Sequence, residues 1–287
     1  MAKVYDALRR AEAERRRRSG HEPGASGPLE WEPEAGSSPV IAPASLVDRP
    51  SLWSRLWAGR RRAGLESAGD LNKRRISLLQ PDSYVAEQFR ALRGRIDAIS
   101  ADKPLRTIAV TSATPGEGKT TSAINLAIVT SLSVGRRVLL VDCDLRRPKV
   151  HTSLGLSAEA GLAEVLTDQI GLEQAIVKPE GMGLEILAVR GRPANPSELL
   201  GSARMRELIE EVAARYDRVI LDTPAALGLP DAKAVADLCD GIVVVVRADV
   251  TPQEDVQTVL EIVDRRRVLG LVLNGAVADQ GRYGYAN

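Results

Sequence analysis

The feature that most constrains this chain is the stretch covering residues 106–127. An apolar run at residues 108–110, typical of a buried strand, is followed by a glycine-rich turn and then by a helix-compatible segment. This order of strand, loop and helix is the context that a phosphate-binding loop requires. The first glycine of the usual pattern is replaced by Ala113. An ordinary glycine-containing loop is the alternative, which the strand–loop–helix order disfavours.

The residue types in this turn suit an anionic ligand. Gly116 and Gly118 let backbone N–H groups turn toward an anion, and the following helix adds the positive end of its dipole. Lys119 would reach the phosphates and the Thr120 hydroxyl would bind Mg²⁺. We therefore expect ATP and Mg²⁺ as cofactors. The expected nucleotide-binding residues of this loop are Thr114, Gly116, Glu117, Gly118, Lys119, Thr120 and Thr121.

Acidic residues follow two further apolar runs. Residues 138–141 lead into Asp142 and Asp144, and residues 219–221 lead into Asp222. Ligands bind at the carboxyl ends of strands in parallel sheets, and residues two apart on an extended chain point the same way. We expect Asp142 and Asp144 to face one metal or hydroxyl, and Asp222 to hold Mg²⁺ together with Thr120. A merely polar strand end is the alternative.

The remaining patterns complete an α/β fold. Further strands are expected at residues 184–189, 242–246 and 268–274, and helices at 120–132, 195–215 (with Ser197 as N-cap) and 252–265. Alternating strands and helices predict a P-loop NTPase with a mostly parallel, buried sheet flanked by helices. A helix within residues 80–100 should turn Phe89, Leu92 and Ile96 toward the core.

The N-terminal part has a different composition. Residues 1–18 predict a basic amphipathic helix, either a solvated tail or a docking helix for a partner or an anionic membrane. Residues 19–76 predict a low-complexity linker, so the folded P-loop domain is expected at 77–287, after a largely disordered extension. Trp53 and Trp57 stand beside arginines in this linker, where they would contact a membrane surface or pack on the folded domain.

Charge and cysteine content exclude several classes. The formal net charge of +1 gives no overall field favouring nucleic acid, so no nucleic-acid partner is expected. Cys143 and Cys239 stand far apart without zinc-ligand spacing, which suits reduced, buried thiols in a cytoplasmic protein. Apolar runs fall short of the roughly 20 residues of a membrane-spanning helix.

Several ordered motifs resemble those of the bacterial tyrosine kinases, P-loop autokinases of polysaccharide synthesis and export that are related to the Min/Par ATPases. Residues 114–120 resemble the family's Walker A motif, 141–148 its Walker A′ motif and 220–224 its Walker B motif. Residues 87–93 fit the E-x-x-R-x-x-R motif, and residues 195–200 and 272–274 are similar to other family segments. The resemblance covers roughly residues 77–287.

The resemblance implies a protein-tyrosine autokinase regulating exopolysaccharide or capsule polymerisation and export. By that resemblance Asn274 contacts adenine, Tyr283 and Tyr285 are the autophosphorylation sites, and Glu87, Arg90 and Arg93 form the subunit interface of a ring. Lys119, Asp142, Asp144 and Asp222 would be catalytic, with Asp142 assisting the tyrosine hydroxyl. Implied partners are a membrane-bound activator of the co-polymerase type, which would hold the chain at the inner face of the membrane, and a cognate tyrosine phosphatase.

Two rival functions remain open. A Min/Par-like positioning ATPase would carry a signature lysine five residues before Lys119, where this chain has Thr114. A nucleotide-dependent scaffold would assemble and regulate a polysaccharide machine without transferring phosphate. The tail has only Tyr283 and Tyr285, fewer tyrosines than family members usually carry, and an unmodified end is the alternative to an acceptor.

Overall fold

The structure is a computed structural model that describes residues 80, 82–157, 159–179 and 183–276. The predicted basic helix at 1–18, the linker at 19–76 with its tryptophans, and the tail tyrosines Tyr283 and Tyr285 lie outside the described residues. The expected boundary at residue 77 also lies outside them, so the division into domains stays a prediction.

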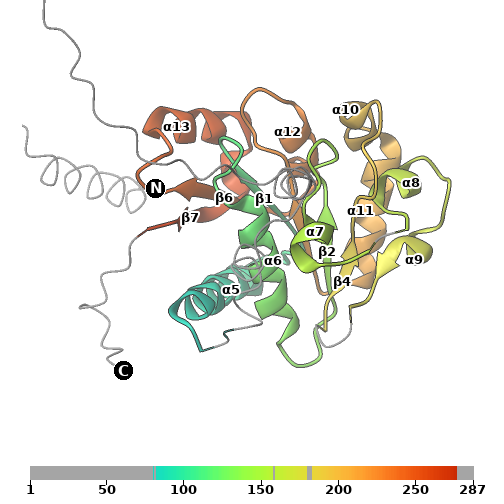
Figure 1. The fold of residues 1–287 in the computed structure, drawn as a ribbon. Helices are drawn as coiled ribbons and strands as arrows, with labels where there is room; N and C mark the ends of the chain where they lie inside the picture. The colour runs from blue at the N-terminus through green and yellow to red at the C-terminus, as the bar shows by residue number, and fades with distance from the viewer. Residues whose placement is uncertain (1–79, 81, 158, 180–182, 277–287) are drawn as a thin grey trace, which may run out of the picture. The chain divides into compact units, whose positions relative to one another are not determined.

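A seven-stranded sheet forms the centre of the described part (Figure 1), with strand order β3-β4-β2-β5-β1-β6-β7. All neighbouring strands pair in parallel except β3 and β4, which are antiparallel. This confirms the predicted mostly parallel sheet. The strands are β1 Thr107–Ser112, β2 Val138–Asp142, β3 Ile176–Val177, β4 Glu185–Leu187, β5 Arg218–Asp222, β6 Gly241–Arg247 and β7 Val268–Asn274.

Successive side chains on each strand point to opposite faces of the sheet, so a separate hydrophobic core forms on each face. One core takes Ala109, Leu139, Val141, Val219 and Leu221 from the sheet, and the other takes their neighbours in sequence. Helices α5, α6 and α7 cover the second face, whereas α8 to α13 pack on the first (Figure 1). The helices are α5 Tyr84–Asp102, α6 Lys119–Ser131, α7 Val150–Leu154, α8 Leu162–Leu166, α9 Leu172–Ala175, α10 Pro196–Leu200, α11 Ala203–Arg215, α12 Asp231–Ala236 and α13 Gln253–Ile262.

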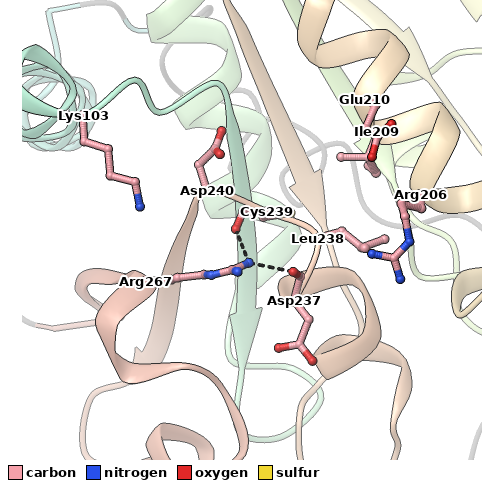
Figure 2. Close-up of a pocket in the computed structure, with 9 residues that line it drawn as sticks. All are labelled: Lys103, Arg206, Ile209, Glu210, Asp237, Leu238, Cys239, Asp240 and Arg267. Carbon is pink, nitrogen blue, oxygen red and sulfur yellow. Dashed lines mark hydrogen bonds between the residues drawn. The ribbon is translucent and has the colours of Figure 1, made fainter.

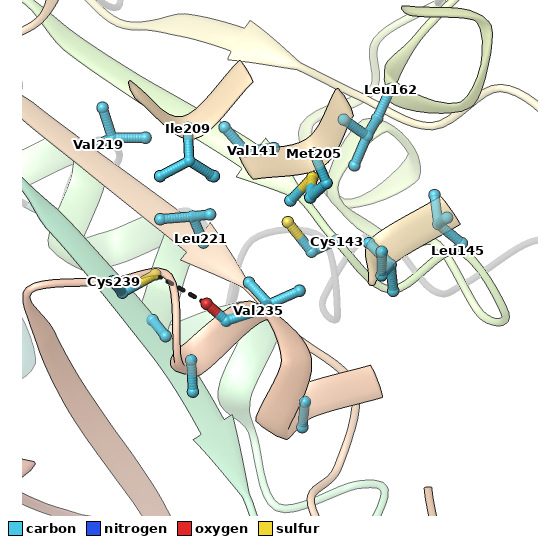
Figure 3. Packing of buried hydrophobic residues seen from close by; sticks show 14 of the residues in the cluster. Val141, Cys143, Leu145, Leu162, Met205, Ile209, Val219, Leu221, Val235 and Cys239 are labelled. Carbon is cyan, nitrogen blue, oxygen red and sulfur yellow. Dashed lines mark hydrogen bonds between the residues drawn. The ribbon is translucent and has the colours of Figure 1, made fainter. Parts of the chain in front are cut away.

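Both cysteines lie in the first of these cores. Cys143 and Cys239 are buried and reduced, as the sequence predicts. The Cys239 thiol donates to the carbonyl of Val235 at 3.3 Å (Figure 3). They therefore act as small apolar side chains in the packing.

The segment at residues 195–215 differs from its prediction. The expected single helix is broken into α10 and α11, and Ser202, not Ser197, is the N-cap of the longer helix, accepting from the backbone N–H of Met205 at 3.1 Å. Ser197 instead donates to the Asp231 carboxylate at 2.5 Å. A serine N-cap satisfies one orphan N–H group of the first turn, which is why the new helix starts at Ser202.

Helix α5 confirms the predicted apolar face, since Ile96 is buried and Phe89 and Leu92 pack against the same core. Asp97 on this helix forms ion pairs with Arg136 at 2.8 Å and with Arg218 at 3.0 Å. These two ion pairs attach α5 to the start of β5 and to the loop before β2. Among the described helices, none has the length and hydropathy needed to cross a membrane.

Candidate nucleotide-binding site

The loop between β1 and α6 has the backbone of an anion site. Gly116 and Gly118 have φ angles of +92° and +100°, in the left-handed region that glycine adopts without strain. Gly118 is the N-cap of α6 and provides no side-chain cap, so the first N–H groups of the helix have no side-chain acceptor there. Free N–H groups at the positive end of a helix dipole fit a phosphate.

Lys119 lies over a group of carboxylates at the carboxyl edge of the sheet. Its Nζ is 3.1 Å from Asp144 Oδ2, and the two side chains are only 12% and 9% exposed. Burial acts to lower the pKa of Lys119, but the carboxylates of Asp222, Asp144 and Asp142 outweigh it and raise the pKa. Lys119 is therefore a fixed positive charge, as phosphate binding requires.

Asp142 and Asp144 have different partners. Asp142 is fully buried and accepts from the backbone N–H groups of Asp144 (3.1 Å), Lys149 (3.1 Å) and Val150 (3.0 Å). Burial and the charge of Asp222 raise the pKa of Asp142 to about 8. Asp144 pairs with Lys119, as described above. Asp142 thus holds the loop before α7, while Asp144 faces the P-loop.

Asp222 has the surroundings of a cation ligand. It is fully buried, stands opposite Asp142 in the β2–β5 register, and neither carboxylate oxygen has a hydrogen-bond partner among the described residues. Burial raises the pKa of Asp222 to about 6, although Lys119 and the nearby Thr120 hydroxyl lower it. An unpartnered buried carboxylate is costly, and Mg²⁺ prefers such oxygen ligands. Asp222 and the Thr120 hydroxyl therefore fit the oxygen ligands that Mg²⁺ would take at this site.

The side chain of Glu117 is directed into the protein. Its carboxylate accepts from the N–H and hydroxyl of Thr114, both at 3.0 Å, and from the hydroxyl of Thr251 at 2.6 Å. The side-chain amide of Asn274 donates to the Glu117 carbonyl at 2.9 Å. Asn274, which the family resemblance expects to contact adenine, therefore lies beside the P-loop, and its contact with adenine stays a prediction. Thr251 was missed, because the sequence around it has no signal linking it to a loop 134 residues away.

The expected interface residues lie on α5, away from these carboxylates. Glu87 and Arg90 form an ion pair on the surface. Arg93 instead donates to the Val129 carbonyl at 2.7 Å and to the Ser133 hydroxyl at 3.0 Å, near the end of α6. The motif is therefore divided: its first two charges are available at the surface, and its third attaches α5 to α6.

A separate hollow of about 260 Å³ lies at the opposite, amino edge of the sheet (Figure 2). Lys103, Arg206 and Asp240 line it, and Arg267 donates there to the carbonyls of Asp237 (2.6 Å) and Cys239 (2.9 Å). Arg267 thus ties together the loops that precede β6 and β7. None of the residues expected to bind nucleotide lines this hollow.

Comparisons with known proteins identify the family. A family model described as an AAA domain matches residues 105–268. Tyrosine-protein kinase YwqD of Bacillus subtilis (strain 168) is 38% identical over 213 residues, covering 73% of this chain and 90% of YwqD. This chain belongs to the bacterial tyrosine kinase family.

A solved structure and a longer relative extend the match. The kinase domain of Escherichia coli tyrosine kinase ETK superposes with a TM-score of 0.68 at 29% identity, covering 80% of this chain and 89% of that domain. Succinoglycan biosynthesis transport protein ExoP of Rhizobium meliloti (strain 1021) is 36% identical over 205 residues, covering 70% of this chain. The match spans only 26% of ExoP, so ExoP is much longer than the shared part.

Proposed function

We propose that this chain is an ATP-dependent protein-tyrosine kinase that phosphorylates itself. The observation that carries the proposal is the fully buried, unpartnered Asp222 carboxylate beside Thr120 and within the field of Lys119. These three groups would offer a ligand set for a cation and a fixed positive charge for phosphate. Its similarity to YwqD and to the ETK kinase domain supports phosphoryl transfer to tyrosine as the reaction.

The chain's own residues would act mainly by positioning and charge neutralisation, which phosphoryl transfer chiefly requires. Lys119 and the N–H groups from Gly116 to Thr120 would hold the phosphates. Thr120 and Asp222 would hold Mg²⁺, which supplies neutralisation of phosphate charge when bound. Asp142, with its raised pKa, is our candidate for accepting the tyrosine hydroxyl proton, and Asp144 would orient Lys119 through their 3.1 Å ion pair.

The acceptor and assembly proposals rest on family resemblance. Tyr283 and Tyr285 would be the acceptors, presented to a neighbouring subunit in a closed ring. The surface ion pair of Glu87 and Arg90 would contact that neighbour. Arg93 would support the interface indirectly, through the position of α5.

The cellular role follows from the relatives. ExoP is named for succinoglycan biosynthesis transport, and we propose a related role in exopolysaccharide or capsule polymerisation and export. A membrane-bound activator would hold this chain at the inner face of the membrane, and a tyrosine phosphatase would reverse its modification. A peripheral membrane contact through residues 1–76 belongs to the same proposal.

The deciding experiment is incubation with γ-labelled ATP and Mg²⁺, followed by phosphoamino-acid analysis. Phosphotyrosine in the wild type and in Lys233→Met, but not in Lys119→Met, is the expected result. Lys233 is the matched control, because it pairs on the surface with Asp237 at 2.6 Å. ATP hydrolysis without phosphotyrosine would favour the positioning ATPase, and nucleotide binding without either reaction would favour the scaffold.

A further inference from the structure

The P-loop is held from outside by two residues that lie far from it in sequence. Thr251 follows β6, and Asn274 is the last residue of β7. Both contact Glu117, the first through the side-chain carboxylate and the second through the carbonyl oxygen. We infer that Thr251 and Asn274 are positioning residues that hold the phosphate-binding loop in its binding-competent conformation through Glu117. This inference rests on the proposed nucleotide binding.

The buried Glu117 carboxylate requires several hydrogen-bond donors. The residue is only 2% exposed, and a buried charge is tolerated only when hydrogen bonds compensate it. Thr114 provides two of its donors from within the loop, and Thr251 provides one from outside it. The Thr251 hydroxyl therefore connects the Glu117 carboxylate, and through it Thr114, to the turn after β6.

The turn that carries Thr251 is itself fixed. The Thr251 hydroxyl accepts from the N–H of Arg247 at 2.9 Å, and the Thr251 N–H donates to the Arg247 carbonyl at 3.0 Å. Asp249, between them, has a positive φ of 58°. Aspartate enters this left-handed region more readily than most non-glycine residues, so it suits the turn. The two hydrogen bonds between Arg247 and Thr251 close the turn and place the Thr251 hydroxyl beside Glu117.

Asn274 completes the support from the other side. Its carbonyl accepts from the Ala248 N–H at 2.8 Å, which joins the end of β7 to the same turn. A Cβ atom added to Gly118 would lie 2.0 Å from the Asn274 amide nitrogen. Asn274 therefore packs directly against the backbone at the N-terminus of α6, where the phosphates would bind.

This arrangement separates two roles for Asn274. A residue that contacts adenine affects only ligands that have the base, whereas a residue that positions the loop affects any polyphosphate. If the loop leaves its competent conformation, the apparent affinity falls in proportion to the competent fraction. Tripolyphosphate, which has phosphates but no base, distinguishes the two roles.

The test compares ATP and tripolyphosphate binding, each with Mg²⁺, by calorimetry on the full chain. Thr251→Val and Asn274→Ala should each lower the affinity for both ligands by about tenfold. The loss of one hydrogen bond to a charged or buried group has a free-energy cost that corresponds to a change of this size. Thr251→Ser, which keeps the hydroxyl, should bind like the wild type. Thr258→Val is the matched control, because its hydroxyl donates within α13, to the Glu254 carbonyl.

Amide hydrogen exchange adds a readout that needs no ligand. Residues 112–119 should exchange faster in Thr251→Val than in wild type or Thr258→Val. Unchanged tripolyphosphate affinity in Thr251→Val would overturn the inference. An Asn274→Ala variant that loses affinity for ATP but not for tripolyphosphate would overturn it too, because Asn274 would then act on the base. A wild type that binds tripolyphosphate but makes no phosphotyrosine would refute the proposed kinase and leave the positioning role intact.

Discussion

Replacing Lys119 with methionine should affect stability as well as activity. At a separation of 3.1 Å, the Lys119–Asp144 attraction is roughly 5 kcal/mol at an effective dielectric constant near 20. Removing one partner of a buried pair leaves the other uncompensated, at a net cost of about 3 kcal/mol. Asp222 also loses the charge that lowers its pKa. We therefore expect a folded Lys119→Met protein with a reduced free energy of unfolding and no phosphoryl transfer.

Urea unfolding of the nucleotide-free protein at pH 8, where ionised carboxylates repel one another most, measures this cost. Asp144→Asn is the matched variant, and the double variant should lose less than the sum of the two single losses, by about 1–3 kcal/mol. The cost should shrink at pH 5, because the Asp222 carboxylate, without the Lys119 charge that lowers its pKa, then takes up a proton. A Lys119→Met free energy of unfolding equal to that of the wild type at pH 8 would refute the reasoning. Wild-type phosphotyrosine in that variant would refute the catalytic role of Lys119.

Two further predictions follow from other contacts, and a third follows from the proposed acceptor tyrosines. Burial acts to raise the pKa of Glu185, but hydrogen bonds from Tyr216 and Lys178 outweigh it and lower the pKa. The ionised carboxylate therefore stabilises the fold above the pKa of the unfolded chain, and this contribution is lost as the pH falls through the folded pKa. Glu185→Gln should therefore melt below the wild type at pH 7 and converge with it below about pH 4, a window set by the ordinary glutamate pKa; parallel melting curves would contradict this. Arg90→Ala should lower the mass of the oligomer in light scattering with little loss of stability. Arg93→Ala should lower the free energy of unfolding by about 1–3 kcal/mol, because it leaves the Val129 carbonyl and the Ser133 hydroxyl without their donor. Equal stability of the two variants would reject the division of the motif. Phosphate should appear on Tyr283 or Tyr285 by mass spectrometry after incubation with Mg-ATP, and labelling that persists unchanged in the double Tyr→Phe variant would place the acceptor elsewhere.

Local patterns made much of the fold predictable. The P-loop, its helix and the acidic strand ends each lie within a few consecutive residues, and continuous apolar runs mark strands buried on both faces. Ser197 misled the helix prediction because serine is a preferred N-cap residue, whereas α10 has Asn195 as its N-cap and Ser197 lies in its first turn. Its actual partner, Asp231, is distant in sequence.

The roles within the site were less predictable. Asp142 and Asp144 share a strand end, yet only the folded chain brings Lys149 and Val150 to one and Lys119 to the other. The contact between Glu117 and Thr251 likewise depends on how the strands are ordered in the sheet, which no short pattern encodes. The sequence thus predicts which residues lie at the carboxyl edge of the sheet, and the topology determines which partners each of them contacts.

The order of the strands also affects how the chain is made. β5 lies between β1 and β2, and Thr107 pairs with Val219, about 110 residues later in the chain. A ribosome adding about 5–20 residues per second therefore leaves β1 without that neighbour for roughly 5–20 s. During this interval the apolar strands that frame the P-loop have no central strand to pair with. Nascent chains should consequently need protection from aggregation until residue 222 has left the ribosome.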